Sequence, residues 1–490
     1  MIEDSRPEDN SPSQMSPARD QFHSMYIFWA ILAAFFFIHL YRLSAPPNGY
    51  HKWRESDTAA ISLNYYQEDS NFFHPRINQR GATSGITGME LPIYNYSVFL
   101  LYLLFGLSHA IPRLITIIGA CLCLWLFFKI VASLMSDRVA VWSVLAMAFS
   151  PLFFFYSYKI MPDIWMLTFL LGAVYFYLRF NHDRNYPALI VSGVCLCLSG
   201  CIKPTALFIY LPFLFLWWSG KKRDRAVIVS LLIYIAVTFA IVWGWIQYAS
   251  WVNDEYGSGG FYLGENLPNF HHFLFASQFY RKLFMQWPFE LWIGWSLVPA
   301  FLYGIYRAVK DKSGRIFLVW ILGAYLVFAV TAEKSASHDY YTLIIVPSLA
   351  VFSGLGLASL HSGAGWRRNI VIILVLAALP VAMARIHSRF GPTEDFAAIR
   401  ESAEKIIPAG DLVMAQDNSP AVRLYQLNRR GWPLRFGIRC SQVIDYVRQG
   451  AKFLVLENPI ETYNDSLALI FDNNASRIGP LYCYSLRYKN

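Results

Sequence analysis

The stretch IPRLITIIGACLCLWLFFKIVAS, residues 111–133, decides the class of fold. A helix of these 23 residues would be about 34 Å long, which is enough to cross the roughly 30 Å hydrocarbon core of a bilayer. Ten further apolar runs lie near residues 25–42, 139–157, 163–180, 186–201, 204–218, 226–248, 285–306, 316–332, 342–360 and 369–386. The sequence therefore predicts an α-helical polytopic membrane protein with about eleven transmembrane helices.

The overall composition supports the same class. Of the 490 residues, 56% are hydrophobic and only 15% are charged, whereas soluble domains carry about 25% charged residues. The formal net charge of +9 comes largely from Lys and Arg in short loops between the apolar runs, where basic residues set membrane orientation. This charge does not indicate a nucleic-acid-binding surface, and no nucleic-acid partner is expected.

The basic loops also set the expected orientation. They fall on one side of the membrane, KKRDR at 221–225 among them, only if the short apolar run 91–106 is not a span. The positive-inside rule places that side in the cytoplasm. We therefore expect 91–106 to form an interfacial or re-entrant helix within a long first external loop, residues 43–110. The N-terminus is then cytoplasmic and the C-terminus external.

The same pattern predicts three segments. Residues 1–24 are polar and rich in Ser and Pro, which predicts a disordered cytoplasmic N-terminus. Residues 25–386 form the transmembrane part. Residues 387–490 alternate between helix and strand patterns, such as TEDFAAIRESAEKII (393–407) and AKFLVLE (451–457). They predict a small external α/β domain.

The stretch LYQLNRRGWPL (424–434) in this tail allows two interpretations. Arg429, Arg430 and Trp432 could contact a sugar or a lipid headgroup. A turn with solvated charges explains the same residues and is the stronger interpretation. The tail contains no G-x-G-x-x-G or P-loop motif, so nothing in it supports nucleotide binding.

The stretch WRESDTAAI (53–61) is the first candidate for chemistry on the external face. It places Arg54, Glu55 and Asp57 within four residues, directly after the first apolar run. Carboxylates at a membrane boundary are costly unless they are hydrated, paired or functional. Arg54 could pair with Asp57, and Ser56 or Asp57 could cap a helix. Structural and catalytic roles therefore both fit this stretch.

Three other external residues join this group. Asp163 in KIMPD and Glu90 in MELP read in isolation as a helix N-cap and a loop residue. Lys203 in CIKPT lies in a short external turn, against the orientation rule, and therefore needs a partner. A bound phosphate and an Asp side chain fit that partner equally well.

The stretch SHDYYTLIIVP (337–347) lies at the mouth of a predicted span. Tyr340 and Tyr341 are ordinary for a membrane interface, whereas a His338 beside an Asp339 is less common there. A metal site would require further ligands at known spacing, and the motifs HxH, HExxH and CxxC are absent from the sequence.

These motifs, in this order and on this side, resemble those of a known family. They are similar to the membrane glycosyltransferases of the GT-C fold that use polyprenyl-phosphate sugars, in the branch related to the protein O-mannosyltransferases and the lipid A aminoarabinose transferase. The resemblance covers about residues 25–360. The motifs that carry it are WRESDT, HPRINQRG, GMELPIYNY, SPLFFFYSYKIMPD, KPTAL and HDYYTLIIVPSLAVFSGLGL.

The resemblance implies an inverting hexosyl- or pentosyltransferase. It would move a sugar from a polyprenyl-phosphate carrier, such as undecaprenyl phosphate, to a glycan, lipid or protein acceptor on the external face. Asp57 would orient or deprotonate the acceptor hydroxyl, with Glu55 as the alternative base. Asp163 and Glu90 match the other acidic positions of the family. The phosphate that leaves would need positive charge, from side chains or from a divalent cation such as Mg²⁺ or Mn²⁺.

One departure from the family concerns that phosphate. In the aminoarabinose transferase branch a Lys follows the acidic residue of the GMELP motif, whereas this chain has Leu91. We therefore expect other side chains to contact the phosphate, and the candidates are Lys203, His338, Arg76, Arg281, Tyr340 and Tyr341. The implied setting is a bacterial inner membrane, with the site and the C-terminus in the periplasm and with lipopolysaccharide among the envelope products. A lumenal site in an endoplasmic reticulum membrane has the same sidedness.

Two other functions remain open from the sequence alone. A flippase or transporter for a lipid-linked sugar would need charges at mid-membrane and two related halves, and no such halves are evident. An oligosaccharide polymerase or ligase would transfer a whole glycan. Such an enzyme would have the same membrane topology as a glycosyltransferase that moves one sugar, so the sequence does not distinguish these two functions well.

Overall fold

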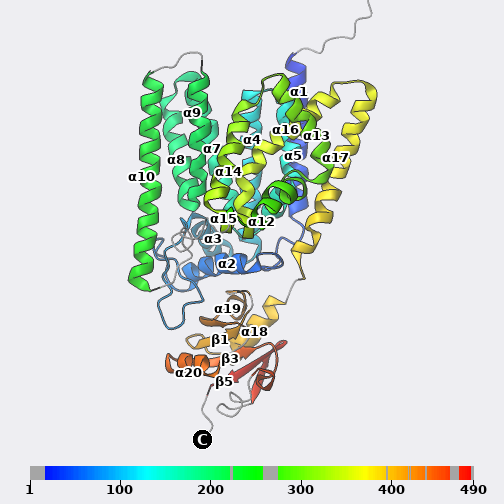
Figure 1. The fold of residues 1–490 in the computed structure, drawn as a ribbon. Coiled ribbons are helices and arrows are strands. Elements are labelled where there is room, and N and C mark those ends of the chain that lie inside the picture. The colour runs from blue at the N-terminus through cyan, green and yellow to red at the C-terminus, as the bar shows by residue number, and fades with distance from the viewer. Residues whose placement is uncertain are drawn as a thin grey trace, which may run out of the picture.

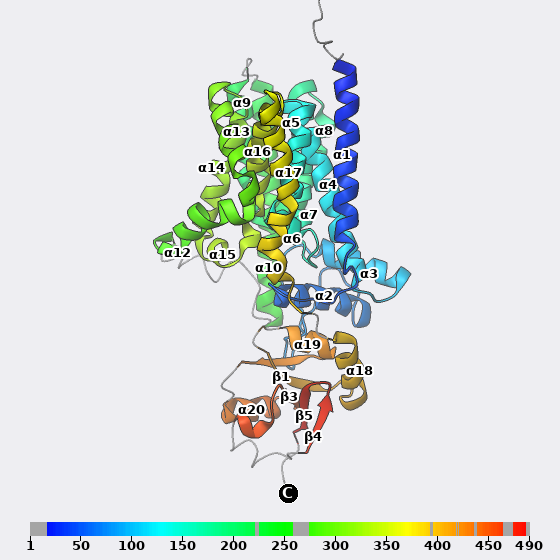
Figure 2. The same cartoon turned by 90° about the vertical axis from the view of Figure 1, so that its right-hand side faces the viewer.

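The protein consists of a helical bundle, two helices that lie across one end of it, and a small sheet beyond them (Figure 1, Figure 2). A computed structural model describes residues 17–220, 225–257, 274–392, 395–417, 419, 421–435, 439–463 and 474–486. Most of the predicted disordered N-terminus, residues 1–16, lies outside these described residues. So do residues 258–273, which lie between the predicted apolar runs 226–248 and 285–306.

The bundle is built from helices that run roughly side by side (Figure 1). They are α1 (Pro17–His39), α4 (Ala110–Leu134), α5 (Asp137–Ala148), α6 (Pro151–Tyr156), α7 (Asp163–Asp183), α8 (Tyr186–Ile202), α9 (Tyr210–Ser219), α10 (Arg225–Tyr256), α13 (Val298–Lys310), α14 (Arg315–Val330), α15 (Ala332–Ser337), α16 (Val346–His361) and α17 (Gly365–Ile386). Shorter segments join or extend them: η1 (Pro204–Ile209), α12 (Ser277–Tyr280), η4 (Arg281–Gln286), η5 (Pro288–Ile293), η6 (Trp295–Leu297), η7 (Asp339–Ile345) and η8 (His387–Phe390).

Five continuous helices in the described part of the chain are long and apolar enough to cross a membrane. They are Ala110–Leu134, Asp163–Asp183, Arg225–Tyr256, Asp339–His361 and Gly365–Phe390. The pair Trp295–Lys310 and Arg315–Val330, bent by 118° at a short break, adds a sixth if it is one span. The prediction of a multi-pass membrane protein is thus confirmed. The count of eleven remains a prediction, because several of the predicted runs form helices that are short or broken.

Two of the predicted apolar runs show why the number of spans expected from the sequence differs from the number of long helices in the structure. The run 139–157 is divided between α5 and α6, and α6 begins at Pro151, which has no N–H to continue the preceding helix. The run 285–306 is interrupted at Gly294, whose φ of +81° is readily adopted only by glycine. An apolar pattern reports burial in lipid or protein, but it does not report such breaks.

Glycines bring the central helices of the bundle into close contact. A Cβ atom at Gly304 of α13 would lie 1.8 Å from the carbonyl oxygen of Phe352 in α16. A Cβ atom at Gly356 of α16 would lie 1.8 Å from the carbonyl oxygen of Ala300 in α13. Small residues at such crossings let two membrane helices pack backbone against backbone.

Helices α2 (Lys52–Gln67) and α3 (Ile93–Phe105) lie across the end of the bundle that faces the sheet (Figure 1, Figure 2). With 13 residues, α3 is about 20 Å long, too short to cross the hydrocarbon core. Val98 and Tyr102 of α3 share a buried cluster with Ala59 and Leu63 of α2. This placement is consistent with the interfacial helix expected at 91–106.

The C-terminal part contains a five-stranded sheet in the order β2-β1-β3-β5-β4. Its strands are β1 (Leu412–Gln416), β2 (Gly431–Leu434), β3 (Ala451–Leu456), β4 (Ala475–Ile478) and β5 (Leu481–Ser485), and its helical segments are α18 (Phe396–Ile406), α19 (Val422–Leu427), α20 (Cys440–Arg448) and η9 (Ile460–Thr462). β1 pairs in parallel with β2 and β3, whereas β5 is antiparallel to β3 and β4. A small sheet with helices is present, as expected for an α/β fold.

Two expectations about local structure are wrong. Within 424–434 only residues 428–430 form a turn, between the end of α19 and strand β2, and its Arg429 is buried rather than solvated. Residues 17–24 are not disordered, because α1 begins at Pro17, a residue well suited to the first helical position.

Candidate active site

Helix α2 begins five residues earlier than the Ser-Asp pair suggested. Its N-terminal boundary is Lys52, preceded by His51 in the left-handed conformation with φ +60°. The turn before it requires Gly49, since a Cβ atom there would lie 2.0 Å from the carbonyl oxygen of Arg389. The expectation that Asp57 caps the helix is therefore wrong: Asp57 lies in its second turn.

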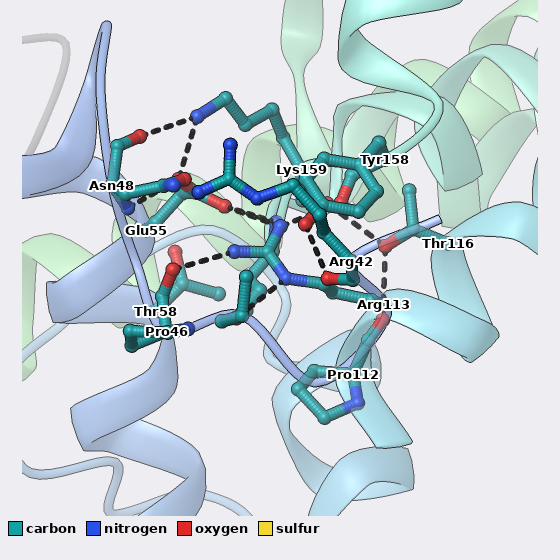
Figure 3. A network of polar contacts seen from close by, with 12 residues as sticks. Arg42, Pro46, Asn48, Glu55, Thr58, Pro112, Arg113, Thr116, Tyr158 and Lys159 are labelled. Carbon is teal, nitrogen blue, oxygen red and sulfur yellow. Dashed lines mark hydrogen bonds and ion pairs between the residues drawn. The ribbon is translucent and has the colours of Figure 1, made fainter. Parts of the chain in front are cut away.

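Glu55 is held by a set of donors from three parts of the chain (Figure 3). Lys159 Nζ lies 2.7 Å from one carboxylate oxygen, and Arg113 Nη1 lies 3.0 Å from the other. The backbone N–H groups of Ile160 and Asn48 also donate to this carboxylate, at 3.0 and 3.3 Å. Burial favours the neutral form of Glu55, but Lys159 and Arg113 outweigh it and hold its pKa below the usual value.

The cations that pair with Glu55 are themselves fully used. Arg113 donates to the carbonyl oxygens of Ala45, Pro46 and Tyr158 at 2.8–2.9 Å, and Lys159 donates to that of Asn48 at 2.7 Å. These contacts join α2, the start of α4, the loop after α1 and the loop after α6 (Figure 3). Because these buried charges are paired and hydrogen-bonded, they hold the backbone segments in place rather than bind a substrate.

Asp57 has the opposite environment. Its side chain is fully buried, yet neither carboxylate oxygen has a hydrogen-bond partner among the described residues. The nearest cation is Arg54, whose Nη1 lies 4.0 Å from Asp57 Oδ2. Burial raises the pKa of Asp57 to about 7, against a smaller lowering by Arg54. A buried carboxylate without partners calls for an explanation, and a perturbed acid in a polar cluster is a candidate for catalysis.

Glu90 is brought to this place by two contacts. Arg54 Nη2 forms an ion pair with Glu90 Oε1, so the same guanidinium faces both Glu90 and Asp57. The next residue, Leu91, donates its N–H to the carbonyl oxygen of Cys201 at 2.9 Å. Leu91, the position at which the aminoarabinose transferase branch carries a Lys, therefore lies beside the turn that contains Lys203.

Lys203 and Asp163 form the second charged pair of the site. Lys203 Nζ is bound to Asp163 Oδ1, while Asp163 Oδ2 is buried with no partner within the described ranges. The partner that the sequence required for Lys203 is thus an Asp side chain. The ammonium group also lies over the rings of Tyr340 and Tyr341, at 4.4 and 4.3 Å from their centroids, which stabilises the cation.

His338 lies on the other side of the tyrosines. Its ring stacks on Tyr340 with a centroid distance of 5.5 Å and lies 5.4 Å from the ring of His51. Burial, together with the neighbouring His51, lowers the pKa of His338 to about 4. The imidazole is therefore neutral near pH 7 and offers hydrogen bonds rather than positive charge.

Asp339 binds Arg389, which lies in the segment between α17 and the C-terminal sheet. Its carboxylate accepts from Tyr156 Oη and from Arg389 Nη1, the latter at 2.5 Å, and lies 3.5 Å from His51 Nε2. The N–H of Tyr50 donates to the carbonyl oxygen of Arg389 at 2.7 Å. The segment that follows α17 thus closes over the loop that precedes α2.

Two of the predicted phosphate-binding residues lie outside this cluster. Arg76 pairs with Glu68 and Asp69 beyond the C-terminal end of α2. Arg281 is exposed at the start of η4. The structure therefore brings together Asp57, Glu90, Asp163, Lys203, His338, Tyr340 and Tyr341 and separates Arg76 and Arg281 from them. Among the described residues, no three His, Cys, Asp or Glu side chains are grouped so that they could hold a metal ion.

An apolar groove leads to the same cluster along the bundle. It has a volume of about 880 Å³ and runs between α8 and α10, which stand next to each other in Figure 1. Its lining is almost entirely apolar and includes Leu91 and Cys201, the hydrogen-bonded pair beside Lys203. A hydrocarbon chain in this groove would end at the charged cluster.

Four residues that the sequence analysis did not select shape the site. Arg113 and Lys159 hold Glu55, and His51 and Arg389 hold Asp339. The signal for Arg113 was present, because a charge inside an apolar run is rare and has a partner when it occurs. The role of Arg389 had no comparable signal, since its partner lies 50 residues earlier in the chain.

Comparison with solved structures decides the fold. ArnT from Cupriavidus metallidurans, in a structure bound to undecaprenyl phosphate, superposes with a TM-score of 0.65 at 13% identity, covering 94% of this chain and 98% of ArnT. The chain has the GT-C glycosyltransferase fold. The archaeal oligosaccharyltransferase AglB from Archaeoglobus fulgidus, in complex with an inhibitory peptide and a dolichol-phosphate, gives 0.58 at 12% identity, over 89% of this chain and 70% of AglB.

Sequence comparisons agree with this assignment of the GT-C fold. The family model for dolichyl-phosphate-mannose-protein mannosyltransferases matches residues 90–246. A GPI alpha-1,2-mannosyltransferase 3 from Xenopus laevis is 22% identical over 319 residues, which are 63% of this chain and 57% of that relative. The chain thus spans little more than half the length of this curated relative. The resemblance to GT-C glycosyltransferases inferred from the motifs is confirmed.

Proposed function

We propose that this GT-C protein is an inverting glycosyltransferase that moves a sugar from a polyprenyl-phosphate carrier to an acceptor hydroxyl. The observation that carries the proposal is Asp57, a buried carboxylate whose two oxygens lack partners within the described residues. Its pKa of about 7 suits a general base at neutral pH. Glu55 cannot take this role in the same state, because Lys159 and Arg113 occupy its oxygens.

The donor fits a groove and a cluster that meet at Leu91. The isoprenoid chain would lie in the apolar groove between α8 and α10, and the phosphate would lie near Lys203 and Arg54. The complexes of ArnT with undecaprenyl phosphate and of AglB with a dolichol-phosphate support a carrier of this class. Lys203 is available because an incoming phosphate can replace Asp163 as its partner, keeping the ammonium paired.

The reaction follows as a single displacement. Asp57 accepts the proton of the acceptor hydroxyl as the oxygen forms its bond to the anomeric carbon. The bond from that carbon to the phosphate oxygen breaks, and its electron pair leaves with the polyprenyl phosphate. Attack from the face opposite the leaving group inverts the anomeric configuration. Lys203 and Arg54 stabilise the phosphate charge. Glu90 holds Arg54 in position, and Asp163 holds Lys203 until the phosphate replaces it.

We place the site on the external face of the membrane. The support is the distribution of basic residues, which predicts that KIMPD (159–163) and the turn with Lys203 are external. Both lie at one end of the bundle together with Tyr340, from the mouth of a predicted span. We further propose a bacterial inner membrane with a periplasmic site and a glycan, lipid or protein as acceptor. Asp163 and Glu90 are engaged with Lys203 and Arg54, and no three acidic, His or Cys side chains of the described residues are grouped to hold a divalent cation, so we assign the positive charge next to the phosphate to Lys203 and Arg54.

The proposal is tested with purified full chain and a panel of polyprenyl-phosphate sugars labelled in the sugar. Release of free polyprenyl phosphate together with a labelled acceptor is the expected result, in the presence of Mg²⁺ or of EDTA. Movement of intact donor across a vesicle membrane without cleavage would identify a flippase instead. Transfer only from donors that carry an assembled oligosaccharide would identify a polymerase or ligase.

A further inference from the structure

A polar cavity of about 430 Å³ lies where the first loop meets the sheet. Its walls come from the C-terminal half of α2, the loop that follows it, and the tail around strand β2. This cavity is separate from the charged cluster at Asp57 and from the apolar groove, with which it shares no lining residue. It includes Arg429 and Arg430, for which the sequence left contact with a sugar or a lipid headgroup as the weaker of two interpretations.

The two parts of the chain that form the cavity are joined by their backbones. Gly81 donates its N–H to the carbonyl oxygen of Gly431 at 2.9 Å, and Gly431 donates to that of Asn78 at 3.1 Å. Gly81 also lies flat against the indole of Trp432, where a Cβ atom would be 2.6 Å from the ring nitrogen. The cavity is therefore a built feature of a fixed junction.

Three guanidinium groups line the cavity, and two of them are already engaged. The side chain of Arg80 is 1% exposed and binds Glu68 and the carbonyl oxygen of Ser84. Arg429 is 5% exposed and donates to the carbonyl oxygens of Ile407 and Asn428. With Glu68 as the one carboxylate in the lining, the cavity carries a net positive charge.

Arg430 differs from these two. Its Nε atom is buried without a hydrogen-bond partner, and its guanidinium has no ion pair within the described ranges of the chain. A buried charged donor that makes no hydrogen bond destabilises the fold, unless a ligand supplies the acceptor. The side chains of Asn64, Asn78 and Asn428 also line the cavity, and Asn64 Nδ2 donates to Asn78 Oδ1 at 2.9 Å and to the carbonyl oxygen of Arg76 at 2.7 Å.

We infer that this cavity binds an acidic saccharide, a sugar that carries a carboxylate or a phosphate. Arg430 would bind the acidic group, because a guanidinium pairs with a carboxylate or phosphate through two parallel hydrogen bonds. The asparagine amides would bind hydroxyl groups. Apolar ligands do not fit, since most of the lining is polar, in contrast to the groove between α8 and α10.

The inferred role, which rests on the proposed function, is to hold the acceptor. Asn64 in the cavity and Asp57 in the catalytic cluster lie on the same helix, seven residues apart, so their backbone positions differ by about 10 Å along its axis. An acceptor whose acidic unit is bound at Arg430 therefore extends along α2 toward the base.

The test measures binding separately from transfer. Glucuronate, glucose 1-phosphate, inorganic phosphate and neutral methyl glucoside are titrated into purified full chain, and binding is measured by calorimetry. Both acidic sugars are expected to bind at least tenfold more tightly than methyl glucoside and than inorganic phosphate. Arg430→Gln is expected to weaken them tenfold or more, and Arg430→Lys less. Arg448→Gln, an exposed arginine of the same part of the chain that pairs with Asp445, serves as the matched control.

The outcomes separate this inference from the proposed function. Equal binding of methyl glucoside, binding of inorganic phosphate as tight as that of the sugars, or no effect of Arg430→Gln would overturn the acidic-saccharide site. If Arg430→Gln weakens the acidic sugars but leaves the KM for an acidic acceptor unchanged in the transfer assay, the acceptor role is wrong. If the acidic sugars bind through Arg430 but no polyprenyl-phosphate sugar is cleaved, the proposed function fails while the site stands.

Discussion

Two carboxylates of helix α2 have opposite hydrogen-bonding environments. Glu55 and Asp57 are two residues apart and both fully buried, yet Glu55 accepts from four donors and Asp57 from none within the described residues. The first arrangement satisfies a charge and fixes the loop around it. The second keeps a charge unsatisfied next to a cluster of cations. Stability and reactivity are thus assigned to different residues of one helical turn.

The largest expected effect is on transfer. Asp57→Asn removes the proposed base while keeping the shape of the side chain, and should lower kcat by about 10²–10⁴-fold, the usual contribution of general base catalysis. In the wild-type protein, kcat/KM should rise with pH to a plateau, with an apparent pKa near 7, because only the ionised carboxylate accepts a proton. Release of labelled sugar measured from pH 5 to 9 checks both expectations. Wild-type turnover in Asp57→Asn would show that Asp57 is not the base, and Asp57 would then differ from Glu55 only in its hydrogen bonds.

The next effect is on folding. Glu55→Gln leaves Arg113 and Lys159 buried without their counter-charge and should lower the free energy of unfolding by about 3–5 kcal/mol. The measurement is thermal or denaturant unfolding of the purified protein in detergent. Glu401→Gln, which breaks an exposed pair with Lys405, is the control and should change stability by less than about 0.5 kcal/mol. A Glu55→Gln protein of normal stability that fails in transfer would instead make Glu55 a catalytic residue.

Whereas Glu55→Gln should lower the free energy of unfolding, Asp57→Asn should raise it. Burial raises the pKa of Asp57 from 3.8 to about 7 in the folded protein, so its ionisation destabilises the fold. Well below pH 3.8 the carboxyl is neutral in both states and this contribution vanishes. Stability is lost as pH rises from about 4 through 7 and then levels off, because both states are ionised above that pH. Asp57→Asn should therefore stabilise the protein at pH 8 by up to about 4 kcal/mol and hardly at all at pH 4. Equal melting temperatures of wild type and Asp57→Asn at both pH values would contradict the unpaired state of Asp57.

The smallest expected effect concerns Asp163, which lies between the two extremes with one oxygen paired and one without a partner within the described ranges. Lys203→Gln should raise the KM for the donor about tenfold or more, because a charge-assisted hydrogen bond to phosphate is worth about 1.5–3 kcal/mol. It also leaves Asp163 unpaired, so the double variant Asp163→Asn with Lys203→Gln should regain stability without regaining the donor KM. Arg281→Gln, away from the cluster, should leave that KM unchanged. A donor KM that recovers with stability would show that Lys203 is only a structural partner.

Residue types and their order along the chain predicted much of this site. The charges at 54–57, 90, 163, 203 and 338–341 were selected because they are unusual at the ends of apolar runs, and most of them meet at one end of the bundle. The pairing within the cluster was not predictable, because the partners of Glu55 lie about 60 and 100 residues away. A single sequence shows which groups need partners. It does not show which partner lies near.

The breaks in the bundle mark a second limit. Mean hydropathy treats 285–306 as one span, whereas Gly294 divides it, and the start of α2 was misplaced because a left-handed His51 was not foreseen. Local propensity favoured Ser56 or Asp57 as the cap. A long-range contact between Gly49 and the backbone of Arg389 overrides that preference. Predictions that rested on periodicity held better than those that rested on the boundaries of elements.

The contact of Arg389 with Tyr50 and Asp339 also sets an order of events during biosynthesis. Arg389 follows α17, so it leaves the ribosome only after every helix of the described bundle has been made. Until then the loop before α2 lacks the segment that closes over it. A nascent chain halted before α17 would therefore contain Asp57 but lack the contacts of Arg389 with Tyr50 and Asp339.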